Sequence, residues 1–153
     1  MYFWIVAAFM FVLPLASIST ESLLAGAPVG APLVGKWFVF GAVGWRLLLA
    51  GLRQIAQPAY TAREILGLKG EEALILVREL GFANVAMGVL GVASLFMTPW
   101  QLAGALVGAV FYGFAGVNHA REAHRNRMEN VAMVSDLFTA AILLAVCAGA
   151  FLH

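Results

Sequence analysis

The sequence predicts an all-α integral membrane protein, a bundle of five transmembrane helices that forms a single domain over residues 1–153. Of its residues, 63% are apolar or aromatic and only 11% are charged, and the mean hydropathy is +0.92. A soluble domain averages roughly 45–50% apolar and about 25% charged residues, so this chain has too few polar side chains to cover a water-facing surface. In addition, five apolar runs are long enough to cross a hydrocarbon core about 30 Å thick.

Each expected span is a run of roughly 20 mainly apolar residues. The first begins at Tyr2 and lacks the basic residues that open a signal peptide, so we interpret it as an uncleaved span. With so many spans in a short chain, the connections between them are short. We expect the spans at residues 2–18, 32–52, 74–96, 100–117 and 131–152.

The first connection, residues 19–31, is expected to be irregular. It contains Gly26, Pro28 and Gly30, and its single charged residue is Glu21. This composition is typical of a loop at the boundary between lipid and water. No helix is therefore expected there.

The second connection, residues 53–72, is expected to contain a short helix at the membrane interface. After Pro58, Thr61 is followed three residues later by Glu64, which is a capping-box pattern ahead of apolar residues. Between the third and fourth spans, Pro99 indicates a tight turn.

The distribution of Lys and Arg predicts the orientation. Loops that face the cytoplasm carry an excess of these residues. Five crossings then place the N-terminus in the cytoplasm and the C-terminus outside. The basic residues gather around the second and fourth connections, at Arg53, Arg63, Lys69, Arg78, Arg121, Arg125 and Arg127.

Most polar residues in or beside the spans map to the cytoplasmic half. An ionisable side chain in a bilayer costs at least about 2.5–3.5 kcal/mol on insertion scales, so such groups usually face the bundle interior. Asp136 and Arg46 are the deepest of them. We expect Asp136 to pair with Arg46 or Arg78, or to hydrogen-bond with Asn84. The candidate ligand-binding or polar cluster comprises Arg46, Arg78, Glu79, Asn84, His119, Glu122, Asn126, Glu129 and Asp136.

The segment HAREAH, residues 119–124, raises the question of a metal site, because His119 and Glu122 lie one helical turn apart. Helical di-metal carboxylate sites carry Glu-x-x-His twice, whereas this chain has three histidines, one of them the terminal His153. The sequence therefore predicts no metal site and identifies no cofactor or catalytic residue.

Several protein classes are excluded by composition and motifs. The single cysteine, Cys147, rules out a disulfide framework, and a net charge of +1 does not suit a nucleic-acid binder. The chain contains no nucleophile elbow, phosphate loop or dinucleotide fingerprint.

Small residues at helical spacing predict close helix packing. Gly81, Gly88 and Gly91 lie on one face of the third span together with Asn84, and Gly104 begins a GxxxG pattern in the fourth. Such faces let neighbouring helices approach closely.

One resemblance covers about the C-terminal two thirds of the chain. The segments YTAREILGL (60–68), ELGFANVAMGVLG (79–91) and RNRMENVAMVSDLF (125–138) resemble an uncharacterised family of small bacterial multi-pass membrane proteins, a domain of unknown function. The resemblance implies a bundle in the bacterial inner membrane and carries no activity with it.

A second, local resemblance lies at the start of the fifth span. AHRNRMEN, residues 123–130, is similar to the Asn-x-x-Glu-Asn segment of the MAPEG family of glutathione-dependent membrane enzymes. The resemblance implies that Asn126 and Glu129 help to hold glutathione. Glu122 stands where that family has an arginine.

Three functions follow from these observations. The leading hypothesis is a packing or accessory subunit of an oligomer or larger membrane complex, whose partners are the lipid bilayer and other subunits. A small-molecule transporter using Asp136, Glu79 and Arg46 is an alternative, as is a MAPEG-like enzyme. In each case we expect any small-molecule site at the cytoplasmic end of the bundle.

Overall fold

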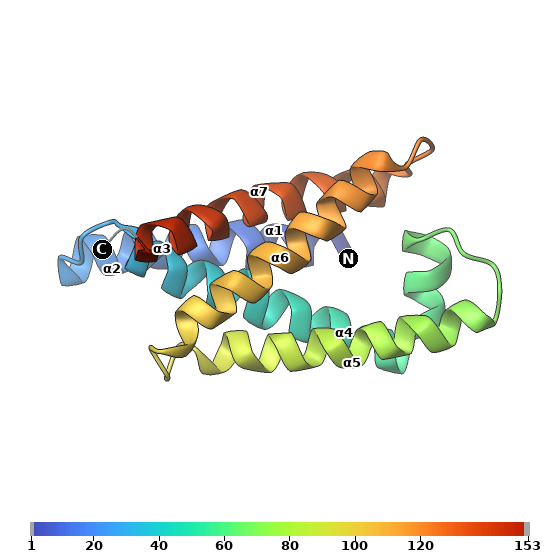
Figure 1. Cartoon of the computed structure of the whole chain (residues 1–153), viewed down its shortest axis with the longest axis horizontal. Helices are drawn as coiled ribbons and strands as arrows, with labels where there is room; N and C mark the ends of the chain where they lie inside the picture. Colours follow the sequence, from blue (N-terminus) through green and yellow to red (C-terminus); the bar gives the residue numbers. More distant parts are fainter. Residues whose placement is uncertain (1, 152–153) are drawn as a thin grey trace.

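The computed structural model describes residues 2–151, and these residues form helices and connections without strands (Figure 1). Five helices are long and apolar enough to cross a membrane. This confirms the all-helical class, and the five candidate membrane helices among the described residues agree with the five expected spans. The spans cover Tyr2–Ala25, Ala31–Ala56, Glu72–Ala93, Trp100–Arg121 and Arg127–Ala150.

The first two spans each contain a π-helical stretch between two α-helices. The first consists of α1 (Tyr2–Ala7), η1 (Ala8–Val12) and α2 (Leu13–Ala25). Pro14 lies just after η1; its ring lacks an N–H and clashes with the carbonyl group four residues earlier, which disturbs the α-helical hydrogen bonds there. The second span consists of α3 (Ala31–Phe38), η2 (Val39–Arg46) and α4 (Leu47–Ala56).

The other three spans are uninterrupted helices: α5 (Glu72–Ala93), α6 (Trp100–Arg121) and α7 (Arg127–Phe151). In Figure 1, α5 runs alongside α4, and α6 crosses in front of the bundle and packs against α7. The α4–α5 and α6–α7 connections lie at one end, which we call the polar end, and the start of α1 points toward that end. The end of α7 and the α2–α3 and α5–α6 connections lie at the other.

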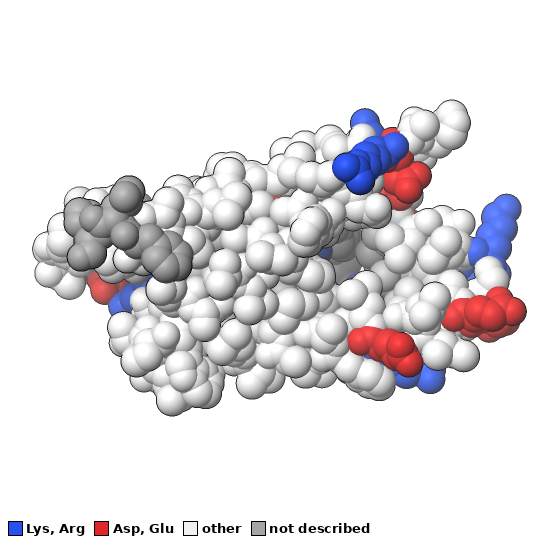
Figure 2. Space-filling view, viewed as in Figure 1, with Lys and Arg blue, Asp and Glu red and all other residues white. Residues whose placement is uncertain are grey.

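The two basic connections therefore lie at the same end of the bundle. Most of the Lys, Arg, Asp and Glu side chains visible in Figure 2 gather at this polar end. The arrangement matches the alternation expected for five crossings.

The expectation that residues 19–31 form no helix is wrong for most of that segment. α2 continues to Ala25 and ends at Gly26, whose φ of 66° is in the left-handed region that favours glycine. Glu21 accepts hydrogen bonds of 2.8 Å from Lys36 Nζ and from Trp37 Nε1. The one charge of the segment thus joins α2 to α3, and only the short stretch after α2 is a loop.

A short helical segment, η3 (Tyr60–Ile65), lies between the second and third spans. The expected capping box is not formed, because Thr61 lies inside the segment and no side chain caps its start at Ala59. Thr61 and Ala62 are buried. η3 thus packs against the end of the bundle.

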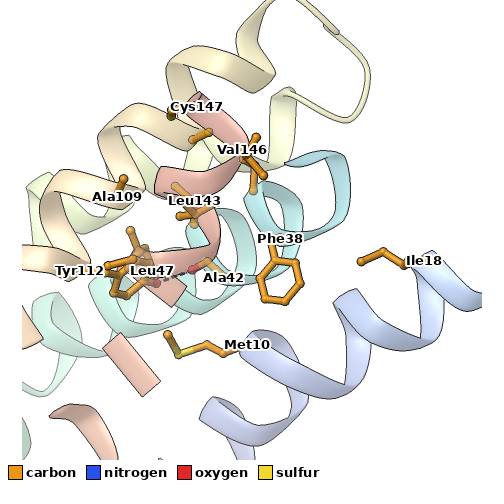
Figure 3. Packing of buried hydrophobic residues seen from close by; sticks show 14 of the residues in the cluster. Met10, Ile18, Phe38, Ala42, Leu47, Ala109, Tyr112, Leu143, Val146 and Cys147 are labelled. Carbon is orange, nitrogen blue, oxygen red and sulfur yellow. Dashed lines mark hydrogen bonds between the residues drawn. The ribbon is translucent and has the colours of Figure 1, made fainter. Parts of the chain in front are cut away.

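The glycines of α5 allow close packing against the second span, which confirms the expected role of this small-residue face. A Cβ atom at Gly81 would lie 3.0 Å from the carbonyl oxygen of Gly51, and one at Gly88 would lie 2.7 Å from Cα of Leu48. Elsewhere the core contains larger side chains, including Met10, Phe38, Leu47, Tyr112 and Leu143 (Figure 3).

Candidate functional site

A cavity of about 170 Å³ lies at the polar end of the bundle. The space-filling view shows the surface hollowed at this end (Figure 2). Apolar side chains such as Ile5, Leu49 and Phe111 form part of the wall. The polar and charged side chains of the lining come from all five spans and η3: Tyr2, Arg46, Arg53, Gln54, Tyr60, Thr61, Asn84, Tyr112, His119 and Asp136.

Arg46 is the last residue of η2 and is only 9% exposed. Because a π-helical stretch changes the angular position of its residues relative to an α-helix, η2 sets the direction in which Arg46 points. The Arg46 Nη2 atom donates a hydrogen bond of 3.2 Å to the Tyr2 hydroxyl, and its guanidinium carbon lies 5.4 Å from the centre of the Tyr2 ring. The Arg46 Nε atom is buried and has no hydrogen-bond partner within residues 2–151.

Asp136 lies on α7 and is 5% exposed. Its Oδ1 atom is buried without a hydrogen-bond partner, and the carboxylate forms no ion pair in the described part of the chain. The expected pairing with Arg46, Arg78 or Asn84 is therefore not seen. A buried carboxylate without a partner is costly, which distinguishes this residue from the paired charges at the surface.

A pair of buried amides joins the second and third spans beside the cavity. Asn84 Nδ2 donates a hydrogen bond of 2.7 Å to Gln54 Oε1. Asn84 Oδ1 is buried and has no partner among the residues that the structure describes. The amide pair thus leaves one acceptor unused at the cavity wall.

Aromatic side chains hold two of the cavity elements in position. The Tyr112 hydroxyl donates a hydrogen bond to the carbonyl oxygen of Ala42, within η2 (Figure 3). The guanidinium of Arg53 lies 3.7 Å from the centre of the Tyr60 ring, which links the end of α4 to η3. A cation over an aromatic face is an attractive contact.

Four of the nine residues predicted for the cluster line the cavity: Arg46, Asn84, His119 and Asp136. Arg78 and Glu79 are exposed on α5. They are six and five residues before Asn84, so at 3.6 residues per turn they point about 120° and about 140° away from it. Arg78 and Glu79 were expected in the cluster because they lie near Asn84 along the span, but they lie on a different face of α5 and do not reach the cavity.

Asn126 and Glu129 form a capping box at the start of α7 instead of lining the cavity. The main-chain N–H groups of Met128 and Glu129 donate to Asn126 Oδ1 at 2.8 and 2.9 Å, and the Asn126 N–H donates to Glu129 Oε2 at 2.7 Å. The Asn126 side chain also donates a 3.2 Å hydrogen bond to the carbonyl oxygen of Ile65, at the end of η3.

Glu122 lies outside the cavity because α6 ends at Arg121. The backbone of Glu122 is extended, so His119 and Glu122 do not have the helical geometry that their spacing predicted. Arg125 donates hydrogen bonds to the carbonyl oxygens of His119, Ala120 and Glu122, at 3.2, 2.9 and 2.6 Å. Within residues 2–151, no three His, Cys, Asp or Glu side chains gather as metal ligands.

The sequence missed six polar residues of the cavity. Tyr112 gave the clearest signal, because a tyrosine inside a span needs a hydrogen-bond partner for its hydroxyl. Tyr2 and Tyr60 resemble the interfacial aromatic residues of any membrane protein, so their sequence positions carry no such signal. The missed residues are Tyr2, Arg53, Gln54, Tyr60, Thr61 and Tyr112.

Comparison with known protein families assigns the chain to one of them. The family described as "Family of unknown function (DUF6790)" matches residues 1–152. The chain belongs to this family. The match extends over nearly the whole chain, beyond the C-terminal two thirds on which the resemblance was based. No curated protein and no solved structure matches the DUF6790 chain.

Membership of DUF6790 agrees with the expectation of an uncharacterised family. Because the DUF6790 description names no activity, the function of this member has to be argued from its cavity.

Proposed function

We propose that this DUF6790 protein is a multi-pass membrane protein that binds a small polar solute inside the bundle, in the cavity at its polar end. The observation that carries the proposal is the buried Asp136 side chain in the cavity lining, whose Oδ1 atom has no hydrogen-bond partner among the residues that the structure describes. An ionisable residue inside a membrane is a functional-site hypothesis by default. A bound solute supplies the hydrogen-bond partner that residues 2–151 do not.

The size and lining of the cavity support a small polar solute. Its volume of about 170 Å³ is below the roughly 300–1,000 Å³ of pockets that hold drug-sized ligands. The wall combines apolar side chains with a few convergent polar groups of both charges, which is the usual composition of a ligand site. A lipid tail would leave Asp136 Oδ1 and the remaining donors of Arg46 without hydrogen-bond partners.

We place the protein in the bacterial inner membrane, with the N-terminus in the cytoplasm, the C-terminus outside and η3 at the cytoplasmic interface. The excess of Lys and Arg in the connections at the polar end supports this orientation. In that orientation the cavity lies on the cytoplasmic side.

Solute transport is the second candidate function. It is favoured by the placement of Arg46 on the second span and Asp136 on the fifth, because relative movement of two spans changes the spacing of the side chains that they carry. Solute entry into sealed proteoliposomes would distinguish a transporter from a protein that only binds.

The two other hypotheses have less support. The glycines of α5 that suited an accessory subunit pack against the second span of the same chain, so they are not available to a partner subunit. Asn126 and Glu129, which carry the likeness to glutathione-dependent enzymes, are bound to each other at the start of α7.

The test is native mass spectrometry of the full chain purified in mild detergent. We expect a retained small molecule that leaves when the protein unfolds. A cavity-filling variant, Ala50→Leu, should lose it, because Ala50 lines the cavity. Ala86→Leu is the matched control, since Ala86 is exposed on α5 and outside the cavity; it should retain the solute.

Retention of the same solute by the unaltered chain and by both variants would mean that the molecule binds elsewhere, and would contradict the proposal. So would the absence of any retained molecule, together with no change in thermal stability when a small-metabolite extract is added.

A further inference from the structure

We propose that the solute is a small bifunctional organic acid, whose acid group binds Arg46 and whose hydrogen-bond donor, a hydroxyl or an ammonium group, binds Asp136. This inference rests on the proposed function and names the chemical class of its ligand. It follows from three properties of the cavity as residues 2–151 form it: unused donors at Arg46, an unused acceptor at Asp136, and the lack of an ion pair between the two residues.

The unused hydrogen-bond donors of Arg46 indicate that the ligand carries an acid group. A guanidinium has five N–H donors, and within residues 2–151 the Arg46 side chain makes one hydrogen bond, from Nη2 to Tyr2. The remaining donors match the two oxygens of a carboxylate, which a guanidinium binds in a planar, bidentate manner. Arg53 adds a second positive charge to the same lining. The lining therefore carries two guanidinium groups against one carboxylate, which favours an anion.

The unused hydrogen-bond acceptor of Asp136 indicates that the ligand also carries a donor group. An ionised carboxylate only accepts hydrogen bonds, so a buried Asp136 needs a donor. None of the described residues supplies one to its Oδ1 atom. A hydroxyl or ammonium group on the ligand would do so, and an ammonium would also balance the charge.

The absence of an ion pair shows why one ligand must carry both groups. Arg46 and Asp136 line the same cavity but do not pair with each other. A simple acid would neutralise Arg46 and leave Asp136 without a donor, while a simple amine would do the reverse. Leaving a buried polar group unpaired is the strongest ground on which a site rejects a ligand analogue.

The experiment measures binding to the full chain in detergent, by titration calorimetry and thermal shift. The first set of probes is glycolate, glycine, acetate and methylamine, and the second, each with one more methyl carbon, is lactate, alanine, propionate and ethylamine. In at least one set we expect the hydroxy acid or the amino acid to bind about ten-fold or more tightly than the simple acid and the simple amine. Comparing the hydroxy acid with the amino acid identifies the donor group.

Two variants assign the groups. Asp136→Leu, which has a similar shape but no hydrogen-bond acceptor, should remove the preference for the bifunctional probe while leaving binding of the simple acid. Arg46→Gln should weaken binding of every acid. Glu79→Gln is the control, because Glu79 is exposed and outside the cavity, and it should bind all probes as the unaltered chain does.

Equal binding of the simple acid and the bifunctional probes would overturn the inference, as would a preference that persists in Asp136→Leu. If no probe binds a chain that still retains a solute in native mass spectrometry, the ligand class is wrong and the proposed function stands. If there is neither a retained solute nor a binding probe, both fail. If Arg46→Gln does not fold, the comparison of probes on the unaltered chain still tests the inference.

Discussion

The Tyr112 hydroxyl on α6 donates a hydrogen bond to the main-chain carbonyl oxygen of Ala42 in η2 (Figure 3). Tyr112 is 1% exposed and Ala42 is fully buried, so the bond lies inside the bundle. Arg46 follows Ala42 by four residues and ends the same π-helical stretch. The bond therefore joins the fourth span to the segment that directs Arg46 into the cavity.

Replacing Tyr112 with Phe should lower the free energy of unfolding by about 1 kcal/mol, because it removes a buried donor and keeps the ring. Thermal unfolding in detergent measures the change. Tyr60→Phe is the matched control: it keeps the ring under Arg53, and no hydrogen bond of its hydroxyl is seen within residues 2–151. Equal effects of the two substitutions would show that the bond to Ala42 contributes nothing.

Asn84 and Gln54 should behave as a coupled pair. Either Asn84→Leu or Gln54→Met alone leaves a buried amide without its partner and should cost about 1–3 kcal/mol. The double variant should cost clearly less than the sum of the two. Denaturation of the three variants measures the coupling, and strictly additive losses would argue against it.

Gly88→Ala should destabilise the bundle by about 1–3 kcal/mol, since the new Cβ would lie 2.7 Å from the backbone of Leu48 and force α5 away from the second span. Gly113→Ala provides the comparison within a helix. Its Cβ would meet only Ala140 Cβ, at 3.9 Å, so stability should stay within about 1 kcal/mol of the unaltered chain. If Gly88→Ala unfolds at the same temperature as Gly113→Ala, the close approach is not required.

Asn126 should have two separable roles. Asn126→Asp keeps the oxygen that caps α7 but cannot donate to the Ile65 carbonyl, whereas Asn126→Ala loses both contacts. We expect faster hydrogen exchange around η3 in both variants. An additional loss of about 1 kcal/mol in unfolding free energy is expected only for Asn126→Ala. Unchanged exchange at η3 in Asn126→Asp would mean that the contact with Ile65 does not hold this segment.

Reporter fusions after Leu68 and after His153 should report opposite sides of the membrane, the first cytoplasmic and the second external. The prediction rests on the basic residues around the second and fourth connections, because loops that face the cytoplasm carry an excess of Lys and Arg. Activity of an alkaline phosphatase reporter and fluorescence of a cytoplasmic reporter distinguish the two sides. Signals from the same side would show that one of the five helices does not cross the membrane.

The sequence by itself determined the class of the protein and the number of its spans. In a lipid environment every backbone polar group must be satisfied internally, so apolar runs of this length become helices almost regardless of their neighbours. The cost of a charge in the membrane also singled out Arg46 and Asp136 before any contact was known. Both inferences depend on local composition, which is visible in the chain itself.

Other features required the tertiary structure. The composition of residues 19–31 indicated a loop, but α2 extends through Ala25, and its Glu21 contacts Lys36 and Trp37. Those partners lie 15 and 16 residues away, beyond the reach of a local pattern.

The set of residues that line the cavity also depends on the tertiary structure. Gln54 and Asn84 meet across two spans, Tyr112 contacts a carbonyl group 70 residues earlier, and Arg78 and Glu79 point elsewhere although they lie close to Asn84 in sequence. Which polar groups share a cavity depends on the rotation of each helix about its axis. That rotation is set by the packing of glycines and large side chains between spans, and by the π-helical stretch that ends at Arg46, none of which a single span encodes alone.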